Sequence, residues 1–209
     1  MEDSVEKDSV TLSDRLRVLI KGVLDPIAAF FNRLGVKPNT ITLFGLIGHG
    51  AAAFLLATGR ITWGGILILI IVPLDALDGT MARLRGHPTK FGAFIDSVTD
   101  RFAEIVIFGG LLLYYLQEQN QVSIILVYLS IAGSIMVSYT RARAEALGFS
   151  VKIGILSRFE RYLILIPALI LNYPIVALWI LAIMTNITAL QRIIYVRRNY
   201  QREHGQLRE

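Results

Sequence analysis

The chain has 209 residues, of which 54% are hydrophobic and only 18% are charged, and its mean hydropathy is +0.57. This composition is too apolar for a soluble enzyme and predicts an integral membrane protein. The lack of cysteine excludes disulfide scaffolds, cysteine metal centres and thiol nucleophiles, and the net charge of +5 is attributed to cytoplasmic loops and not to nucleic-acid binding.

The N-terminal segment, residues 1–40, is expected to lie in the cytoplasm and at the membrane surface. Its first ten residues are acidic, unlike the start of a signal peptide, so no cleaved signal is expected. From Thr11 to Leu34, apolar residues recur at spacings of three and four, with basic residues between them. This pattern is typical of an amphipathic helix in the membrane interface.

Six hydrophobic stretches follow, and each is interpreted as a membrane-spanning helix. They comprise residues 41–58, 61–78, 94–117, 121–139, 156–172 and 174–195. We therefore predict an all-α integral membrane protein in which the interfacial helix precedes a six-helix domain over residues 41–196. A polar cytoplasmic tail is expected over residues 197–209.

Basic residues indicate the orientation of these helices. Six Lys or Arg precede residue 41, three lie at 83–90, five at 141–161 and five from 192 onward. In the remaining connections, Arg60 is the single basic residue. The positive-inside rule thus predicts that both termini lie on the cytoplasmic side.

Four aspartates concentrate near the cytoplasmic ends of two adjacent stretches. Asp75 and Asp78 end the second stretch, and Asp96 and Asp100 begin the third. Spacings of three and four place each pair on one helix face. Ionisable residues at membrane depth are costly and usually functional, and clustered carboxylates suit Mg²⁺, Mn²⁺ or Ca²⁺ better than zinc. The cluster predicts a metal site, with Mg²⁺ expected first and Mn²⁺ as the alternative.

Other interpretations of these residues remain open. The acids would serve packing if they paired with Arg83, Arg101 and other basic residues as interhelical ion pairs. Gly79 and Ala82 form a smooth surface beside the carboxylates, suited either to a ligand or to close helix packing. The histidines are far apart in sequence and are interpreted as structural or solvated: His49, His87 and His204.

The aspartates belong to a longer spaced motif that resembles the signature of the CDP-alcohol phosphotransferases at every fixed position: Asp75-x2-Asp78-Gly79-x2-Ala82-Arg83-x8-Gly92-x3-Asp96-x3-Asp100. The helix layout resembles that family over nearly the whole chain. The resemblance implies an all-helical membrane enzyme, usually a homodimer. Such an enzyme transfers a phosphatidyl or related group from CDP-diacylglycerol, or a similar CDP-lipid, to an alcohol and releases CMP.

The resemblance also implies roles for single residues. Asp75, Asp78 and Asp96 would bind two metal ions, and Asp100 would complete the site and act as the general base. Two metal ions in such a site can clamp a diphosphate and neutralise its charge. The residues expected to contact the CDP-lipid are Asn39, Thr42, Asp75, Gly79, Ala82, Arg83, Gly86 and Thr89.

The segment between the fourth and fifth stretches is similar to that of phosphatidylinositol-phosphate and archaetidylinositol-phosphate synthases. The similarity lies in the run from Arg141 to Glu145 and the run from Arg158 to Arg161, although Ser157 stands where those enzymes usually carry Glu. A phosphorylated acceptor such as inositol 1-phosphate is therefore expected, because arginines bind phosphate well. The arginines expected to bind the acceptor phosphate are Arg141, Arg158, Arg161 and Arg192.

Two alternatives concern the reaction itself. Glycerol 3-phosphate is also a phosphorylated polyol, and its use would make the protein a phosphatidylglycerophosphate synthase. A small cation transporter would line its path with acids as well. Because all four aspartates lie near one membrane surface, and not along a path across it, the sequence favours the enzyme.

Overall fold

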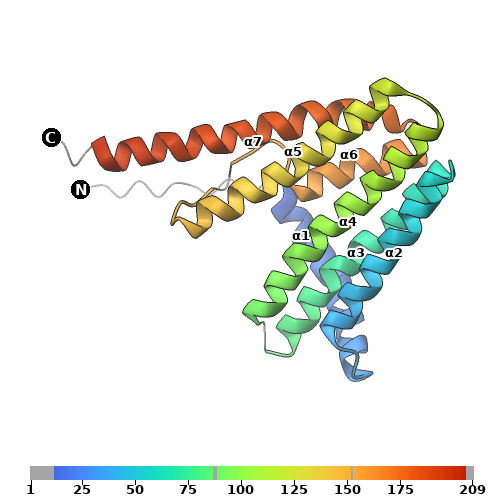
Figure 1. Ribbon diagram of the computed structural model, residues 1–209. Coiled ribbons are helices and arrows are strands. Elements are labelled where there is room, and N and C mark those ends of the chain that lie inside the picture. Colours follow the sequence, from blue (N-terminus) through green and yellow to red (C-terminus); the bar gives the residue numbers. More distant parts are fainter. Residues whose placement is uncertain (1–11, 87–88, 152, 206–209) are drawn as a thin grey trace.

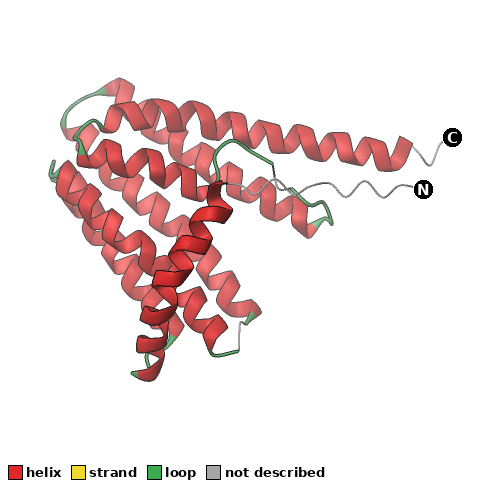
Figure 2. Cartoon of the chain, turned by 180° about the vertical axis from the view of Figure 1, so that it is seen from behind, coloured by secondary structure: helices red, strands yellow, loops and turns green. Residues whose placement is uncertain are grey.

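The computed structural model describes residues 12–86, 89–151 and 153–205, and the regular elements within these ranges are all α-helices (Figures 1 and 2). The acidic first ten residues lie outside this part of the chain. The seven helices of the described ranges are α1 (Leu12–Arg33), α2 (Pro38–Ala57), α3 (Ile61–Leu84), α4 (Lys90–Gln117), α5 (Gln121–Ala146), α6 (Arg158–Ile170) and α7 (Pro174–Gly205).

Four of these helices, α2, α3, α5 and α7, are long and apolar enough to cross a membrane. The other two predicted spans, 94–117 and 156–172, correspond to α4 and α6. These two helices do not combine the length and the apolar, weakly charged composition of the other four. The first turns of α4 carry Asp96, Asp100 and Glu104, and α6 has only 13 residues and begins with Arg158. The structure thus confirms an all-helical membrane protein, while the count of six crossings stays a prediction.

Large apolar side chains cover the outer faces of the spanning helices. Phe44 and Phe54 on α2, Trp63 on α3 and Ile125 on α5 are each more than half exposed. Soluble proteins rarely expose apolar surface on this scale, whereas hydrocarbon chains solvate it well. These faces are therefore suited to contact with lipid.

Helices α2 to α7 pack around a continuous apolar core. Its fully buried side chains come from these six helices and include Leu56, Ile68, Leu111, Val127, Leu169 and Leu178. Small residues bring the helices close, as expected where hydrocarbon surrounds the protein. The clearest case is Gly110 of α4, because a Cβ atom there would collide with the backbone of Ala53 in α2.

Helix α1 lies within the segment from Thr11 to Leu34, where an amphipathic interfacial helix is predicted, and it docks on the end of α3 (Figure 2). Its place in the membrane interface stays a prediction. The Asn32 side-chain amide donates a hydrogen bond to the Met81 carbonyl oxygen at 3.1 Å, and Arg85 Nε donates to Asn32 Oδ1 at 2.6 Å. A small apolar cluster completes the contact and consists of Leu24, Ala28, Ile41, Leu77 and Met81. Helix α1 thereby braces the half of α3 that carries the acidic residues.

Candidate active site

The acidic ends of α3 and α4 lie at the same end of the bundle (Figure 1). Gly86 ends α3 with a φ of 71°, a conformation that glycine adopts without steric penalty. Thr89 caps α4, since the Gly92 backbone N–H donates to its Oγ1 at 2.9 Å. Helix α4 therefore starts beside the end of α3, and residues 75–78 and 96–100 lie at the same end of the bundle.

The four aspartates lie close enough together for their charges to interact. Asp78 interacts electrostatically with Asp75 and Asp96, and Asp100 interacts with Asp96 and Asp75. Like charges are not brought together at membrane depth for stability, because both burial and mutual repulsion oppose it. The juxtaposition therefore points to a positively charged ligand or partner.

Helix α2 holds the Asp78 carboxylate. Thr42 Oγ1 donates to Asp78 Oδ2 at 2.5 Å, and the Gly79 backbone N–H donates to Asp78 Oδ1 at 2.5 Å. The Asp78 residue is 5% exposed, so its carboxylate is held by neighbouring donors and not by bulk water. Thr42 thus supports an acidic residue of the site through a direct hydrogen bond.

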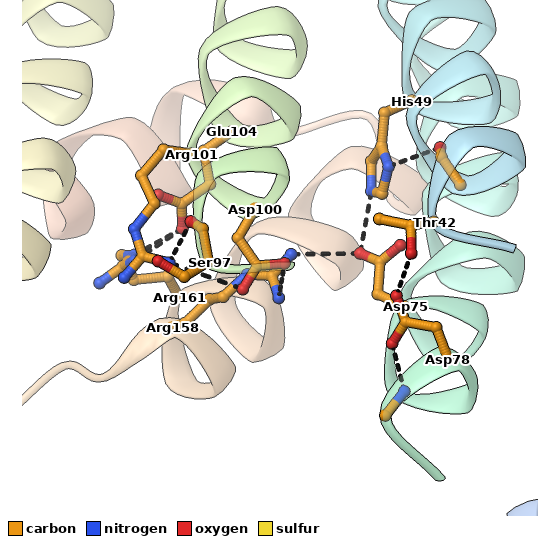
Figure 3. A network of polar contacts seen from close by, with 12 residues as sticks. Thr42, His49, Asp75, Asp78, Ser97, Asp100, Arg101, Glu104, Arg158 and Arg161 are labelled. Atoms are coloured by element: carbon orange, nitrogen blue, oxygen red, sulfur yellow. Dashed lines mark hydrogen bonds and ion pairs between the residues drawn. The ribbon is translucent and has the colours of Figure 1, made fainter. Parts of the chain in front are cut away.

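Arg158 of α6 lies between the two acidic helices (Figure 3). Its Nη1 is 2.6 Å from Asp100 Oδ1, and its Nη2 donates to Asp75 Oδ2 at 3.1 Å. The guanidinium also lies 5.4 Å from the ring centroid of Tyr162, in the geometry of a cation–π contact. Arg158 is predicted to bind an acceptor phosphate, and this role stays a prediction; its guanidinium contacts two aspartates in the structure.

Arg83 and Arg101, the other predicted ion-pair partners of the aspartates, make no contact with them as short as those of Arg158. Arg101 Nη1 lies 3.7 Å from Asp100 Oδ2 while donating to the Ser97 carbonyl oxygen at 2.5 Å. Arg83 donates to the Thr80 hydroxyl at 2.8 Å and lies along α3 beside Gly79. Arg158 is therefore the main cationic partner of the acidic residues among those described.

The four aspartates present oxygen donors that suit a divalent metal ion. Among the described residues, no group of three or more His, Asp or Glu side chains has an arrangement that could hold a metal ion as it stands. Arg158 binds oxygen atoms of two of the carboxylates. The donor chemistry still fits, because two facing helix ends present hard oxygen ligands of the kind that Mg²⁺ and Mn²⁺ prefer.

The structure adds His49 to the site. Its side chain is completely buried, its Nδ1 lies 2.8 Å from the Gly45 carbonyl oxygen and its Nε2 lies 3.8 Å from Asp75 Oδ2 (Figure 3). The sequence analysis interpreted this histidine as structural or solvated. Thr42, Gly45 and His49 have helical spacings of three and four, so they share one face of α2, and this face contacts α3.

Glu104 is a second residue that the sequence analysis missed. Arg161 Nε and Nη2 donate to Glu104 Oε1 at 3.0 and 2.6 Å, and both side chains are buried. Glu104 follows Asp100 by four residues and therefore continues the acidic stripe of α4 by one turn. This i+4 repeat was the available signal, and the pair ties α4 to α6.

The remaining predicted arginines, Arg141 and Arg192, lie on α5 and α7. Arg192 of α7 donates to the carbonyl oxygens of Ile153 at 3.0 Å and Val137 at 2.5 Å. Arg192 interacts electrostatically with both Arg141 and Arg161. Arg141 itself pairs with Glu145 at 2.8 Å on the surface of α5. Arg141, Arg161 and Arg192 thus form one arginine group, and Arg158 points from it to the aspartates.

A family model described as CDP-alcohol phosphatidyltransferase matches residues 36–193, a range that contains the four aspartates and the four arginines. This chain belongs to the CDP-alcohol phosphatidyltransferase family. It is 37% identical to the phosphatidylinositol phosphate synthase of Streptomyces avermitilis, over 90% of this chain and 83% of that protein. It is 33% identical to the archaetidylinositol phosphate synthase of Methanothermobacter thermautotrophicus, over 89% of this chain and 94% of that protein. The resemblance seen in the aspartate motif is therefore confirmed.

Solved structures agree with this assignment. The phosphatidylinositol phosphate synthase of Mycobacterium tuberculosis with CDP-DAG bound superposes with a TM-score of 0.78 and 31% identity, covering 83% of this chain and 93% of that one. The same enzyme in complex with manganese and citrate gives a TM-score of 0.78 and 32% identity, covering 83% and 88% of the two chains.

The residues expected to contact the CDP-lipid lie within the range of the aspartate motif, except Asn39 and Thr42, which precede it. In this family member they lie at the start of α2, at the end of α3 and at the start of α4, and these ends meet on one side of the bundle (Figure 1). Arg83, Gly86 and Thr89 are exposed there, as is Asn39 at the first turn of α2. Ala82 and Gly79 are half-buried and leave the α3 backbone accessible beside Asp78.

Proposed function

We propose that this protein transfers a phosphatidyl or related lipid group from a CDP-linked lipid to inositol 1-phosphate, releasing CMP and forming phosphatidylinositol phosphate. The observation that carries the proposal is that two arginines on one turn of α6 pair with the acidic residues, Arg158 with Asp75 and Asp100 and Arg161 with Glu104. Acids suit a metal-assisted diphosphate site, and arginines suit an acceptor phosphate. Several relatives that match most of this chain carry the same activity in their names.

The aspartates are proposed to hold the metal. Asp75, Asp78, Asp96 and Asp100 would bind two Mg²⁺ ions, with Mn²⁺ as the alternative, and the manganese complex of the Mycobacterium tuberculosis enzyme supports a divalent ion. When bound, such ions neutralise the diphosphate and make its phosphorus atom more electrophilic. Thr42 keeps the Asp78 carboxylate in place for this role.

Asp100 is proposed as the general base. Its carboxylate accepts the proton of the acceptor hydroxyl while the hydroxyl oxygen forms a bond to the lipid-bearing phosphorus. The bond from that phosphorus to the oxygen of CMP breaks, and CMP leaves with the electron pair. A positioned base of this kind contributes about 10² to 10⁴ in rate. The ion pair with Arg158 orients the carboxylate.

The arginine group is proposed to bind the acceptor phosphate. Arg161 Nη1 is buried and has no hydrogen-bond partner in the described part of the chain, so it offers a donor. Arg192 and Arg141 add positive charge beside it. Arg158 lies between this group and Asp100. This placement suits an acceptor whose phosphate binds the arginines while its hydroxyl reaches Asp100.

The membrane arrangement is also a proposal. We place α1 in the interface and the active site and both termini on the cytoplasmic side, where the basic connections lie. In this arrangement α4 and α6 complete six crossings within residues 41–196, and two copies form a homodimer. Helix α7 continues through residue 197 to Gly205, so the polar tail begins as a helix.

The test is CMP release from CDP-diacylglycerol by the purified protein with Mg²⁺ and one of four acceptors: inositol 1-phosphate, glycerol 3-phosphate, free inositol or serine. We expect release with inositol 1-phosphate alone. In Arg161→Ala, the KM for the acceptor should rise far more than that for the CDP-lipid. Preference for glycerol 3-phosphate would contradict the acceptor assignment, and equal changes in both KM values would remove Arg161 from the acceptor site.

A further inference from the structure

A groove lies between α7 and the segment that follows α5 (Figure 1). Its volume is about 470 Å³. Ligand sites commonly have volumes of about 300–1,000 Å³. One wall is formed by Ile153, Gly154 and Ile155, and the other by one face of α7. The four aspartates and the arginine group are not in this lining, so the groove is separate from the candidate active site.

The wall on α7 changes in character along the helix. Four of its residues have spacings of three and four and therefore share one helix face: Gln191, Ile194, Tyr195 and Arg198. Ile194 is 48% exposed, and Arg198 is exposed one turn further along. This face of α7 thus presents an apolar side chain and, next to it, a guanidinium.

The opposite wall is fixed to α7 and exposes apolar side chains. Arg192 Nε donates a hydrogen bond to the Ile153 carbonyl oxygen at 3.0 Å. Gly154 has a φ of 135°, and its backbone lies so close to α7 that a Cβ atom there would be 2.6 Å from Thr188 Cγ2. On either side of this contact, Ile153 and Ile155 remain 36% and 53% exposed. The groove is therefore preformed, with isoleucines on both walls.

The groove combines this apolar surface with positive charge. Among the described residues its lining contains one arginine and neither Asp nor Glu. None of the ion pairs between described side chains involves Arg198. Arg198 lies where α7 passes from its apolar part to a basic end that also carries Arg197 and Arg202. Basic residues at such a boundary attract the headgroups of anionic lipids.

We propose that this groove binds one anionic phospholipid of the surrounding membrane, with an acyl chain along Ile155 and Ile194 and the phosphate at Arg198. A soluble anion would leave the isoleucines without a partner, and a lipid without net charge would leave the arginine without one. Tyr195 suits this position, because tyrosine is enriched at membrane–water interfaces. The proposal goes beyond the proposed function and needs no measurement of CMP release.

The charge of the groove is tested by native mass spectrometry of the purified full chain, titrated with phosphatidylglycerol or with phosphatidylcholine. Arg198→Gln is compared with Arg197→Gln, because Arg197 is also exposed but does not line the groove. The difference between the two variants isolates the groove from other lipid sites on the protein.

We expect phosphatidylglycerol to bind Arg198→Gln about fivefold more weakly than the wild type, and Arg197→Gln as tightly as the wild type. Phosphatidylcholine has no net charge and should bind the wild type more weakly than phosphatidylglycerol does. Equal affinities of phosphatidylglycerol for all three proteins would overturn the proposal. Equal weakening in both variants would also overturn it, because the charge would then act without regard to the groove.

The apolar part of the groove is tested with a second pair of variants. Ile155→Ser should weaken phosphatidylglycerol binding about tenfold through lost apolar burial. Ile193→Ser is the matched control, because Ile193 is 49% exposed on α7 but does not line the groove. Full affinity in Ile155→Ser would overturn the lipid assignment and leave Arg198 as a site for a small anion.

A measurement on the wild type alone avoids any dependence on variants. Phosphatidylglycerol and phosphatidylcholine, each with a photoreactive diazirine in one acyl chain, would be cross-linked to the protein in nanodiscs. We expect phosphatidylglycerol to label Ile153, Ile155 or Ile194 more strongly than phosphatidylcholine does. Equal labelling by both lipids would overturn the proposal. A particle containing two copies, with neither lipid labelling the groove, would assign the groove to a second copy of this chain instead.

Discussion

The Arg158 guanidinium bridges Asp75 on α3 and Asp100 on α4, with nitrogen to oxygen distances of 3.1 and 2.6 Å. These are oxygen atoms that the proposed divalent cation needs. An arginine and a metal ion compete for these carboxylates, because both are positively charged and draw on the same oxygen atoms. Arg158 therefore links the acidic residues to α6, but it also competes for them.

Removing this arginine should tighten metal binding. In Arg158→Ala we expect Mn²⁺ to bind roughly tenfold more tightly, since hydrogen bonds to charged groups contribute about 1.5–3 kcal/mol. CMP release should nevertheless fall, because Asp100 loses the group that orients it. Titration with Mn²⁺ checks the first part. Arg101→Ala is the matched control, because Arg101 lies 3.7 Å from Asp100 and should have a smaller effect. Weaker metal binding in Arg158→Ala would contradict the competition.

The buried pair of Glu104 and Arg161 should be critical for stability. Glu104→Gln leaves a buried guanidinium without its counter-ion, which typically costs about 3–5 kcal/mol. We expect a clear fall in the melting temperature measured in detergent. The chain supplies its own control, because Arg141 and Glu145 form an exposed pair, and Glu145→Gln should cost no more than about 1 kcal/mol. Similar losses in the two variants would show that the buried pair has no special role.

Substitution by alanine should change the stability of the protein differently at two adjacent glycines of α4. Gly110→Ala should lower the melting temperature, because the new Cβ would collide with the Ala53 backbone and push α2 from α4. At Gly109 nothing lies within 4 Å of a Cβ atom, so Gly109→Ala should be neutral or stabilise by about 0.5–1 kcal/mol through helix propensity. Thermal unfolding of both variants checks this, and destabilisation by Gly109→Ala would contradict the packing described.

The sequence predicted a large part of this molecule because hydropathy and helical spacing act locally. The helices over 38–57, 61–84 and 121–146 follow the apolar stretches, and the aspartate spacing placed Asp75 with Asp78 and Asp96 with Asp100 on their helix faces. In contrast, α6 has only 13 residues and falls two residues short of the expected span 156–172 at each end, and its first turn is charged.

Contacts between helices could not be predicted from the spacing of residues along one helix. His49 and Glu104 each stand at a helical spacing from a predicted site residue, but which neighbouring helix each one faces depends on how the bundle packs. The side-chain direction of Arg158 also depends on how the bundle packs. Arg158 and Arg161 lie within one turn of α6, yet Arg158 pairs with Asp100 and Arg161 pairs with Glu104. Long side chains three residues apart can thus serve different sites.

The most direct measurement of the central claim compares CMP release from CDP-diacylglycerol by the wild type, by Asp100→Asn and by Glu118→Gln, each with Mg²⁺ and with EDTA. Glu118 follows the last residue of α4, at the end opposite to Asp100, and is the control. We predict that release requires the divalent ion, falls about 10²- to 10⁴-fold in Asp100→Asn and is unchanged in Glu118→Gln. Release that persists in EDTA, or at the full rate in Asp100→Asn, would contradict the assignment of the aspartates to metal binding and base catalysis.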